Sequence, residues 1–179
     1  NIYTDGNYYG LPKLGYTFMH LYNKQILDDF GVTDYPDIND CTWEKILEIA
    51  KQCTGVNPRT GKQTYGLFVN KGTTTFIELC NYFAKDGSFY SKWDVDSGFT
   101  GDIGKMEITI AGNEAIKKAL NWLKEAANYM PAGWLTGEGT ENFFTEDSDV
   151  AMWMDTDGAG MPKALFDNGD LELLSNYIF

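Results

Sequence analysis

One short run of sequence limits the fold more than any other, because it is extended, uncharged and apolar on both sides. Residues Gly15–Tyr22 read GYTFMHLY, and no charged residue stands between Lys13 and Lys24. Successive side chains of a strand point to opposite faces of its sheet, so every second residue lies on the same face. Here both sets are largely apolar or aromatic, so a strand at this place has to be covered on both sides.

Helix-like and strand-like segments alternate along the rest of the chain. The patterns predict helices over Asn23–Phe30, Thr42–Cys53, Thr73–Lys85 and Asn113–Ala127, and strands over Thr64–Val69 and Val150–Met154. Leu171–Phe179 is expected to be a further strand or the approach to one. This order indicates an α/β domain with helices packed on both faces of a sheet. A length of 179 residues suits one well-cored domain.

Two of these helices have clear caps and apolar stripes. Thr42 and Asn113 are good N-caps. The first helix is expected to bury Trp43, Ile46, Leu47, Ala50 and Cys53, and the second Ile116, Leu120, Leu123 and Ala127.

The charge balance bears on the kind of ligand. The net charge is −12, and Arg59 is the only arginine. Nucleic acids and anionic lipids bind to clustered lysine and arginine, so neither is an expected partner. Arginine is also the usual bidentate partner of phosphate and carboxylate groups, so a neutral ligand fits this chain better.

Catalytic and metal-binding patterns are scarce. The one histidine, His20, falls in the middle of the apolar strand, where a packed and hydrogen-bonded role is the usual one. Cys41 and Cys53 flank a helix that would separate them by about 18 Å, too far for a disulfide. With Cys80 the cysteines are odd in number, so buried, unpaired thiols are expected and no zinc site is.

Three apparent motifs do not fit their templates. Gly55–Lys62 has one residue too many between its glycines for a phosphate-binding loop. A calcium loop beginning at Asp155 would have Phe166 in place of the twelfth-position glutamate, and one beginning at Asp94 would have Lys105. We therefore expect no metal and no cofactor; the alternative for the aspartates is a calcium site of a different type from the EF-hand loop.

Four segments, in order, resemble family 1 of the extracellular solute-binding proteins, the receptors of ABC importers for sugars. They are NYYGLP with LYNKQILDDFGV, CTWEKILEIAKQCT, GKQTYGLFV, and FFTEDSDVAMWMDTDGAG. Two features depart from the family: Asp147-Ser148-Asp149 lacks its usual glycine, and TDGAG stands where a sugar-stacking tryptophan is common.

The resemblance implies a fold and a setting. It implies a three-layer α/β/α lobe of the periplasmic-binding-protein type II fold, with a mixed and mostly parallel sheet. It also implies that residues 1–179 are one lobe, the second of two, cut from a longer protein near both hinge crossings. The expected partners are a mono- or oligosaccharide, the missing first lobe and the membrane permease. The expected location is extracytoplasmic, in a periplasm or as a lipoprotein.

Candidate ligand contacts follow from the loops after strands, where open α/β sheets gather their ligands. They are Tyr16, Thr73, Thr74, Thr75, Phe76, Asp155, Thr156, Asp157 and Gly158, with Trp134 as a further aromatic for the cleft. Tyr16 fits a core position equally well, and one threonine fits an ordinary N-cap. Trp153 is expected to point into the core.

Two alternatives remain beside a non-catalytic receptor lobe. One is a self-contained carbohydrate-binding or adhesion module, which would bind sugar without a second lobe. The other is a glycoside hydrolase that uses Asp155 or Asp157 as its carboxylates. Aspartates in a loop are common turn formers, so ordinary turn formation explains Asp155 and Asp157 better.

Overall fold

The computed structural model describes residues 19–36, 40–69, 73–84, 91–92, 107–108, 112–136, 138, 143–156 and 166–178. The chain divides into two compact units. One comprises Asn1–Thr17 with Phe76–Asn121, and the other comprises Phe18–Thr75 with Trp122–Phe179. The single lobe expected from the sequence stays a prediction.

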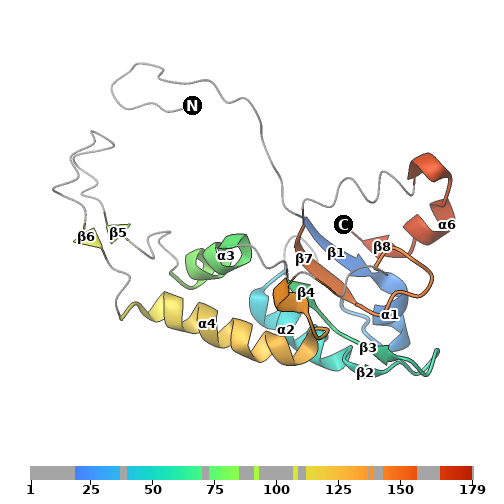
Figure 1. Ribbon diagram of the computed structural model, residues 1–179, viewed down its shortest axis with the longest axis horizontal. Coiled ribbons are helices and arrows are strands. Elements are labelled where there is room, and N and C mark those ends of the chain that lie inside the picture. Colours follow the sequence, from blue (N-terminus) through green and yellow to red (C-terminus); the bar gives the residue numbers. More distant parts are fainter. Residues whose placement is uncertain are drawn as a thin grey trace, which may run out of the picture. The chain divides into compact units, whose positions relative to one another are not determined.

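A four-stranded mixed sheet organises the second unit (Figure 1). Its strands follow the order β4 (Phe68–Val69), β7 (Met152–Thr156), β1 (Met19–Asn23) and β8 (Tyr177–Ile178). Strands β4 and β7 are parallel, whereas β1 is antiparallel to both of its neighbours, β7 and β8. The combination of helices and a mixed sheet agrees with the predicted α/β class.

The position of β1 corrects the expectation of mostly parallel pairing. Strands β4, β7 and β8 run in one direction, and β1 runs against them from inside the sheet. Because β1 has a neighbour on each side, two of the three neighbouring pairs are antiparallel.

The residues of β1 are covered on both sides, as the sequence predicts. Leu21 is 0% exposed and Tyr22 is 5% exposed. Adjacent residues of a strand face opposite sides of the sheet, so both faces are closed at this point. The both-sided apolar pattern was therefore a sound guide to burial.

Side-chain caps begin the helices where the sequence predicts them. Asn23 caps α1 (Lys24–Asp29), Thr42 caps α2 (Trp43–Gln52) and Asn113 caps α4 (Glu114–Ala126). In each case the side-chain oxygen accepts a hydrogen bond from a backbone N–H of the first turn. These bonds satisfy donors that a helix start leaves unpaired.

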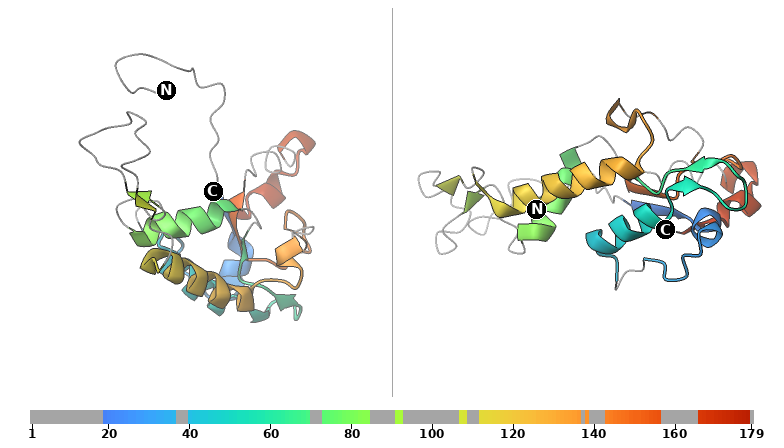
Figure 2. Two further views of the ribbon diagram at one scale, coloured as in Figure 1. Left: turned by 60° about the vertical axis from the view of Figure 1, so that its left-hand side comes forward. Right: turned by 90° about the horizontal axis from the view of Figure 1, so that it is seen from below.

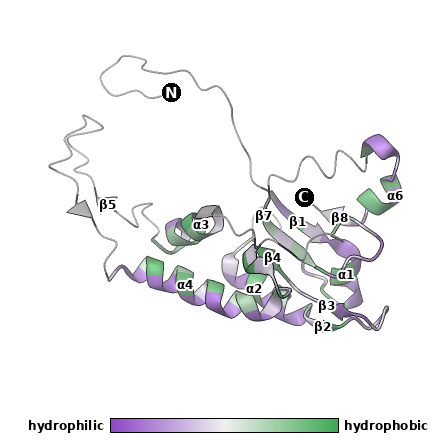
Figure 3. Cartoon of the chain, viewed as in Figure 1, coloured by the Kyte–Doolittle hydropathy of each residue, from purple (hydrophilic) through white to green (hydrophobic). Residues whose placement is uncertain are grey.

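The buried face of α4 differs from the expected one. The buried residues are Ala115, Ala119, Trp122 and Ala126, whereas Leu120 is 53% exposed. Trp122 sets this orientation within the second unit, because its ring packs edge-on against Trp43 at 5.1 Å and its Nε1 donates to the Trp43 carbonyl at 2.8 Å. Hydrophobic and hydrophilic bands alternate along α4 in Figure 3. The periodicity was correct, but the face was wrong.

The strand expected over Thr64–Val69 is two separate strands. Strand β3 (Gln63–Thr64) pairs with β2 (Gly55–Val56) in an antiparallel hairpin, whereas Tyr65 bridges Val150 in parallel and β4 pairs with β7 in the main sheet. Between them Gly66 lies against the backbone of α2. The expected strand is therefore interrupted at Gly66 and Leu67, although Tyr65 and β4 both pair in parallel with the segment that contains β7.

The remaining described elements are short, apart from one helix. They are α3 (Thr73–Ala84), the paired strands β5 (Ser91–Lys92) and β6 (Glu107–Ile108), the 3₁₀ helices η3 (Ala127–Tyr129) and η4 (Trp134–Thr136), and α6 (Leu171–Leu174). Helix α6 and β8 together replace the strand expected over Leu171–Phe179. No helix in the described ranges has the length and apolar character needed to cross a bilayer.

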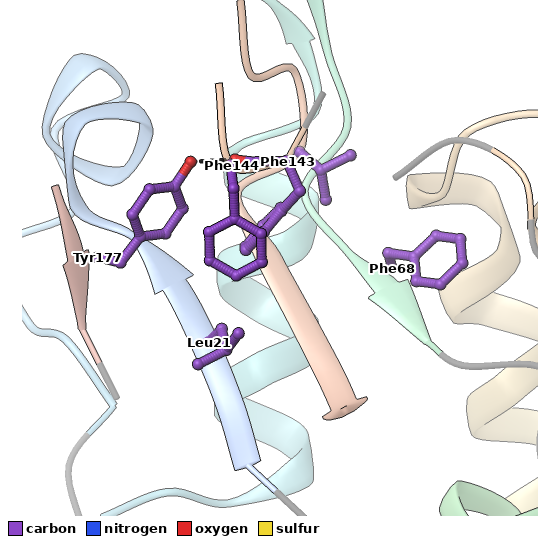
Figure 4. Packing of buried hydrophobic residues seen from close by; sticks show 6 residues of the cluster. Leu21, Phe68, Phe143, Phe144 and Tyr177 are labelled. Atoms are coloured by element: carbon purple, nitrogen blue, oxygen red, sulfur yellow. Dashed lines mark hydrogen bonds between the residues drawn. The ribbon is translucent and has the colours of Figure 1, made fainter. Parts of the chain in front are cut away.

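Aromatic rings from distant segments pack together in the second unit (Figure 4). We define the aromatic cluster as Leu21, Phe68, Phe143, Phe144, Val150 and Tyr177. The Tyr177 hydroxyl donates a hydrogen bond to the Phe143 carbonyl. Burial raises the pKa of Tyr177 to about 12, so this hydroxyl keeps its proton at neutral pH.

A buried carboxylate ties the β2–β3 hairpin to α1. Figure 2 shows the backbone of both elements from two further sides. The Asp29 side chain is 4% exposed, and both of its oxygens accept from Arg59 Nε, at 2.8 and 3.0 Å. Asn57 and Gln25 donate to it at 2.9 and 3.1 Å. Burial acts to raise the pKa of Asp29, but these donors outweigh it, so the pKa lies below the usual 3.8.

This contact predicts a destabilisation that depends on pH. A carboxylate with a depressed folded-state pKa stabilises the fold above its unfolded pKa, and this contribution disappears as the pH falls through the folded value. Replacing Arg59 by methionine is therefore expected to lower the free energy of unfolding by about 1–2 kcal/mol at pH 7. The loss should shrink below pH 3.8, as measured by urea denaturation.

Lys62→Met is the matched control for that experiment. It removes an ion pair with Asp147 whose side chains are 68% and 74% exposed. Exposed pairs contribute about 0–1 kcal/mol, so little change is expected at either pH. Equal losses in the two variants, or a loss in Arg59→Met that persists in acid, would contradict the role given to Asp29.

Candidate functional site

One edge of the sheet collects the segments predicted to contact a ligand. Strands β4 and β7 are parallel, so both end at this edge, and antiparallel β1 begins there. The register pairs Met19 with Thr156 and Val69 with Met154. We call this side of the sheet the carboxyl edge.

The threonine-rich segment follows β4 at the carboxyl edge. Thr73, Thr74 and Thr75 form the first turn of α3, as predicted. Thr75 is 1% exposed, so its side chain belongs to the interior. The first turn of a helix has backbone N–H groups without a helical partner, and such groups are neutral hydrogen-bond donors.

The aspartate-containing segment leaves β7 at the same edge. Asp155 and Thr156 are the last two residues of β7, and Thr156 pairs with the first residue of β1. Asp157, Gly158 and Tyr16 lie outside the described residues. The register thus brings the ends of two candidate segments to one edge, and the roles of their residues stay predictions.

Two further candidates lie elsewhere. Phe76 is half-buried and belongs to the other compact unit. Trp134 is half-buried in η4, where it packs against the aromatic cluster. This packing explains the position of Trp134 without a ligand.

Trp153 points toward the core, as the sequence predicts. Its ring packs edge-on against Phe68 at 5.8 Å and against Phe143 at 5.3 Å. Strand β7 therefore contributes its tryptophan to the aromatic cluster and its last residues to the carboxyl edge.

His20 has the packed, hydrogen-bonded role expected of it. Its Nδ1 contacts the Met154 sulfur on β7, and its ring packs edge-on against Trp43 with 5.5 Å between centroids. Thioether sulfur is a weak acceptor, so this contact assigns Nδ1 as the donor.

The cysteines differ partly from the expectation of buried thiols. None forms a disulfide, and Cys53 and Cys80 are buried, but Cys41 is exposed with its sulfur 3.4 Å from the Tyr22 hydroxyl. Burial raises the pKa of Cys53 to about 12, so its reactive thiolate is scarce at neutral pH. Within the described ranges, no group of three histidine, cysteine or acidic side chains could hold a metal ion.

A polar cavity at the opposite edge of the sheet was missed by the sequence reasoning. It lies where β1 ends and β8 begins, and we call it the amino-edge cavity. It has two halves, of about 190 and 580 Å³, which share Thr145, Glu146, Leu173 and Asn176. The smaller half is also lined by Asn23 and Arg59. No local pattern predicts it, because its walls come from segments far apart in the sequence.

Comparison with known proteins yields no relative: no family model, curated protein or solved structure matches this chain.

Proposed function

We propose that this chain forms one wall of the ligand cleft of a non-catalytic solute-binding protein. The proposed solute is a carbohydrate, and the proposed destination is the permease of an ABC importer. The observation that supports this function is that β4, which precedes Thr73–Thr75 in the sequence, and β7, which ends with Asp155–Thr156, both end at the carboxyl edge. Open α/β sheets bind their ligands outside the carboxyl ends of their strands.

The proposal includes a type II periplasmic-binding lobe that closes on a partner lobe by a hinge, outside the cytoplasm. Such a lobe has a mixed sheet, and β1 does run against β4, β7 and β8.

The charges favour a neutral ligand at the carboxyl edge. The only arginine, Arg59, already binds Asp29, and the net charge of −12 repels anions. The backbone N–H groups in the first turn of α3 are the proposed neutral donors, and Asp155, near the end of β7, is the proposed acceptor. Sugar hydroxyls require both kinds of partner.

The first test is a carbohydrate titration followed by intrinsic tryptophan fluorescence. This chain and the same chain joined to its first lobe are titrated with a panel of mono- and oligosaccharides. The joined protein is expected to respond to one sugar, and this chain alone to respond much more weakly, because half of the contacts are missing. Equal affinity would instead favour a self-contained module.

A pair of aspartate variants separates binding from hydrolysis. Asp155→Asn in the joined protein is expected to weaken binding of the responding sugar about tenfold, because one charge-assisted hydrogen bond is weakened. Asp147→Asn is the control, since its carboxylate is exposed and pairs only with Lys62 among the described residues. Release of reducing sugar by the parent protein, and its loss in Asp155→Asn, would contradict a non-catalytic role.

A further inference from the structure

The amino-edge cavity has a positively charged group at one end. Arg59 lines its smaller half, and its side chain is 53% exposed. Only Nε of the guanidinium binds Asp29; within the described part of the chain, no hydrogen bond involves the two terminal amino groups. These groups form the planar pair of donors that binds a carboxylate end-on.

Negatively charged groups line the larger half, and one of them, Glu146, also lines the smaller half beside Arg59. Glu146, Asp170 and Glu172 line the larger half. Their carboxylates make no hydrogen bond or ion pair with any other described residue. Phe144 and Leu173 add an apolar wall beside them. The larger half, at about 580 Å³, is within the roughly 300–1,000 Å³ of typical small-molecule sites.

We propose that the amino-edge cavity binds a small zwitterion with a cationic side chain, of the basic amino acid class. The ligand carboxylate binds the terminal amino groups of Arg59. Its ammonium groups bind Glu146 and the carboxylates of the larger half, and its methylene chain lies against Leu173. This site is at the opposite edge of the sheet from the proposed sugar site, so neither proposal depends on the other.

Charge complementarity selects this class over simpler ions. An anion would meet Arg59 but also three unpaired carboxylates, and like charges in a shared site repel. A diamine would satisfy the carboxylates but would give the terminal amino groups of Arg59 no carboxylate to bind. A neutral amino acid has no second cation for the larger half. A basic amino acid matches both ends of the cavity.

The test is isothermal titration calorimetry of this chain with three ligands of similar length. L-lysine has all of the required groups, cadaverine lacks the carboxylate, and L-norleucine lacks the side-chain charge. We expect saturable binding of L-lysine with one site per chain, and at least about tenfold weaker binding of each of the others. Absence of L-lysine binding, or equal binding of cadaverine, would overturn the proposal.

Two glutamate variants locate the site. Glu146→Gln removes the carboxylate that both halves share, and its exposed side chain makes it safe for folding. It is expected to weaken L-lysine binding about tenfold. Glu125→Gln, an exposed position on α4 away from the cavity, should bind as the parent does. Equal weakening in both variants would mean attraction to the overall charge, and would reject this site.

Discussion

Replacing Gly66 by alanine is expected to lower the free energy of unfolding by at least about 3 kcal/mol, the upper part of the usual range for overpacking. A Cβ at Gly66 would lie 1.9 Å from the carbonyl oxygen of Ala50, 2.4 Å from its carbonyl carbon and 2.5 Å from its Cα. All three are backbone atoms of α2, so no side-chain rotation relieves the clash. The helix has to move away from the chain between β3 and β4.

The contact at Gly66 also has a hydrogen-bonded link, which a movement of α2 would break. The Thr54 hydroxyl donates to the Ala50 carbonyl at 2.7 Å, and Gly66 N donates to the same hydroxyl at 2.9 Å. Urea denaturation measures the loss, and circular dichroism at low temperature shows whether the variant folds at all. Failure to fold would be the extreme form of the expected result.

Gly31→Ala is the control, because it separates steric overlap from the loss of a glycine. Gly31 has a positive φ of 72°, and a Cβ at this position would have no atom within 4 Å. The stability lost in Gly31→Ala therefore comes only from backbone strain. That strain is roughly 1–2 kcal/mol. If the two variants lost the same stability, close packing of Gly66 on α2 would not be the cause.

Local signals in the sequence predicted the helix starts well. Asn23, Thr42 and Asn113 each cap a helix where the sequence expects one. A cap depends on an oxygen within three residues of the donor, so the sequence contains all of the necessary information. The burial of β1 was predictable for a similar reason, since its alternating residues are apolar on both faces.

Features that depend on distant partners were not predictable. The strand expected over Thr64–Val69 is divided because Gly66 meets α2, which lies at another place in the sequence. The buried side of α4 is set by the packing of Trp122 on Trp43, although leucines offered an equally apolar side. Periodicity predicts that a helix has an apolar face, but a partner decides which face is buried.

The two candidate sites differ in the same way, because one depends on local sequence and the other on distant segments. The carboxyl edge could be anticipated, because the loops after strands are visible in the sequence and parallel strands end together. The amino-edge cavity could not, because Arg59, Glu146 and Asn176 meet only through the hairpin, the turn before β7 and the approach to β8. Its residues have no shared spacing, so only the fold reveals them.

Replacing Phe143 by alanine is expected to lower the free energy of unfolding by about 3–5 kcal/mol. Phe143 is 0% exposed, and its ring centroid is 4.9 Å from that of Phe144 and 5.3 Å from those of Trp153 and Tyr177. Removing it leaves a cavity in the aromatic cluster and takes a neighbour from each of these rings. Urea denaturation, followed by intrinsic tryptophan fluorescence and by near-UV circular dichroism, measures the loss.

Two further substitutions test whether the loss comes from packing at Phe143. Phe143→Leu keeps most of the buried volume, so a smaller loss of about 1–1.5 kcal/mol is expected. Leu135→Ala removes a side chain that is 70% exposed, and its effect should stay within about 0.5 kcal/mol. If the aromatic cluster holds the turn before β7 against β1 and β8, the loss in the free energy of unfolding should be largest in Phe143→Ala, smaller in Phe143→Leu and smallest in Leu135→Ala. If Phe143→Ala lost no more stability than Leu135→Ala, the cluster would not anchor that turn, and the wall of the amino-edge cavity would lack its main support.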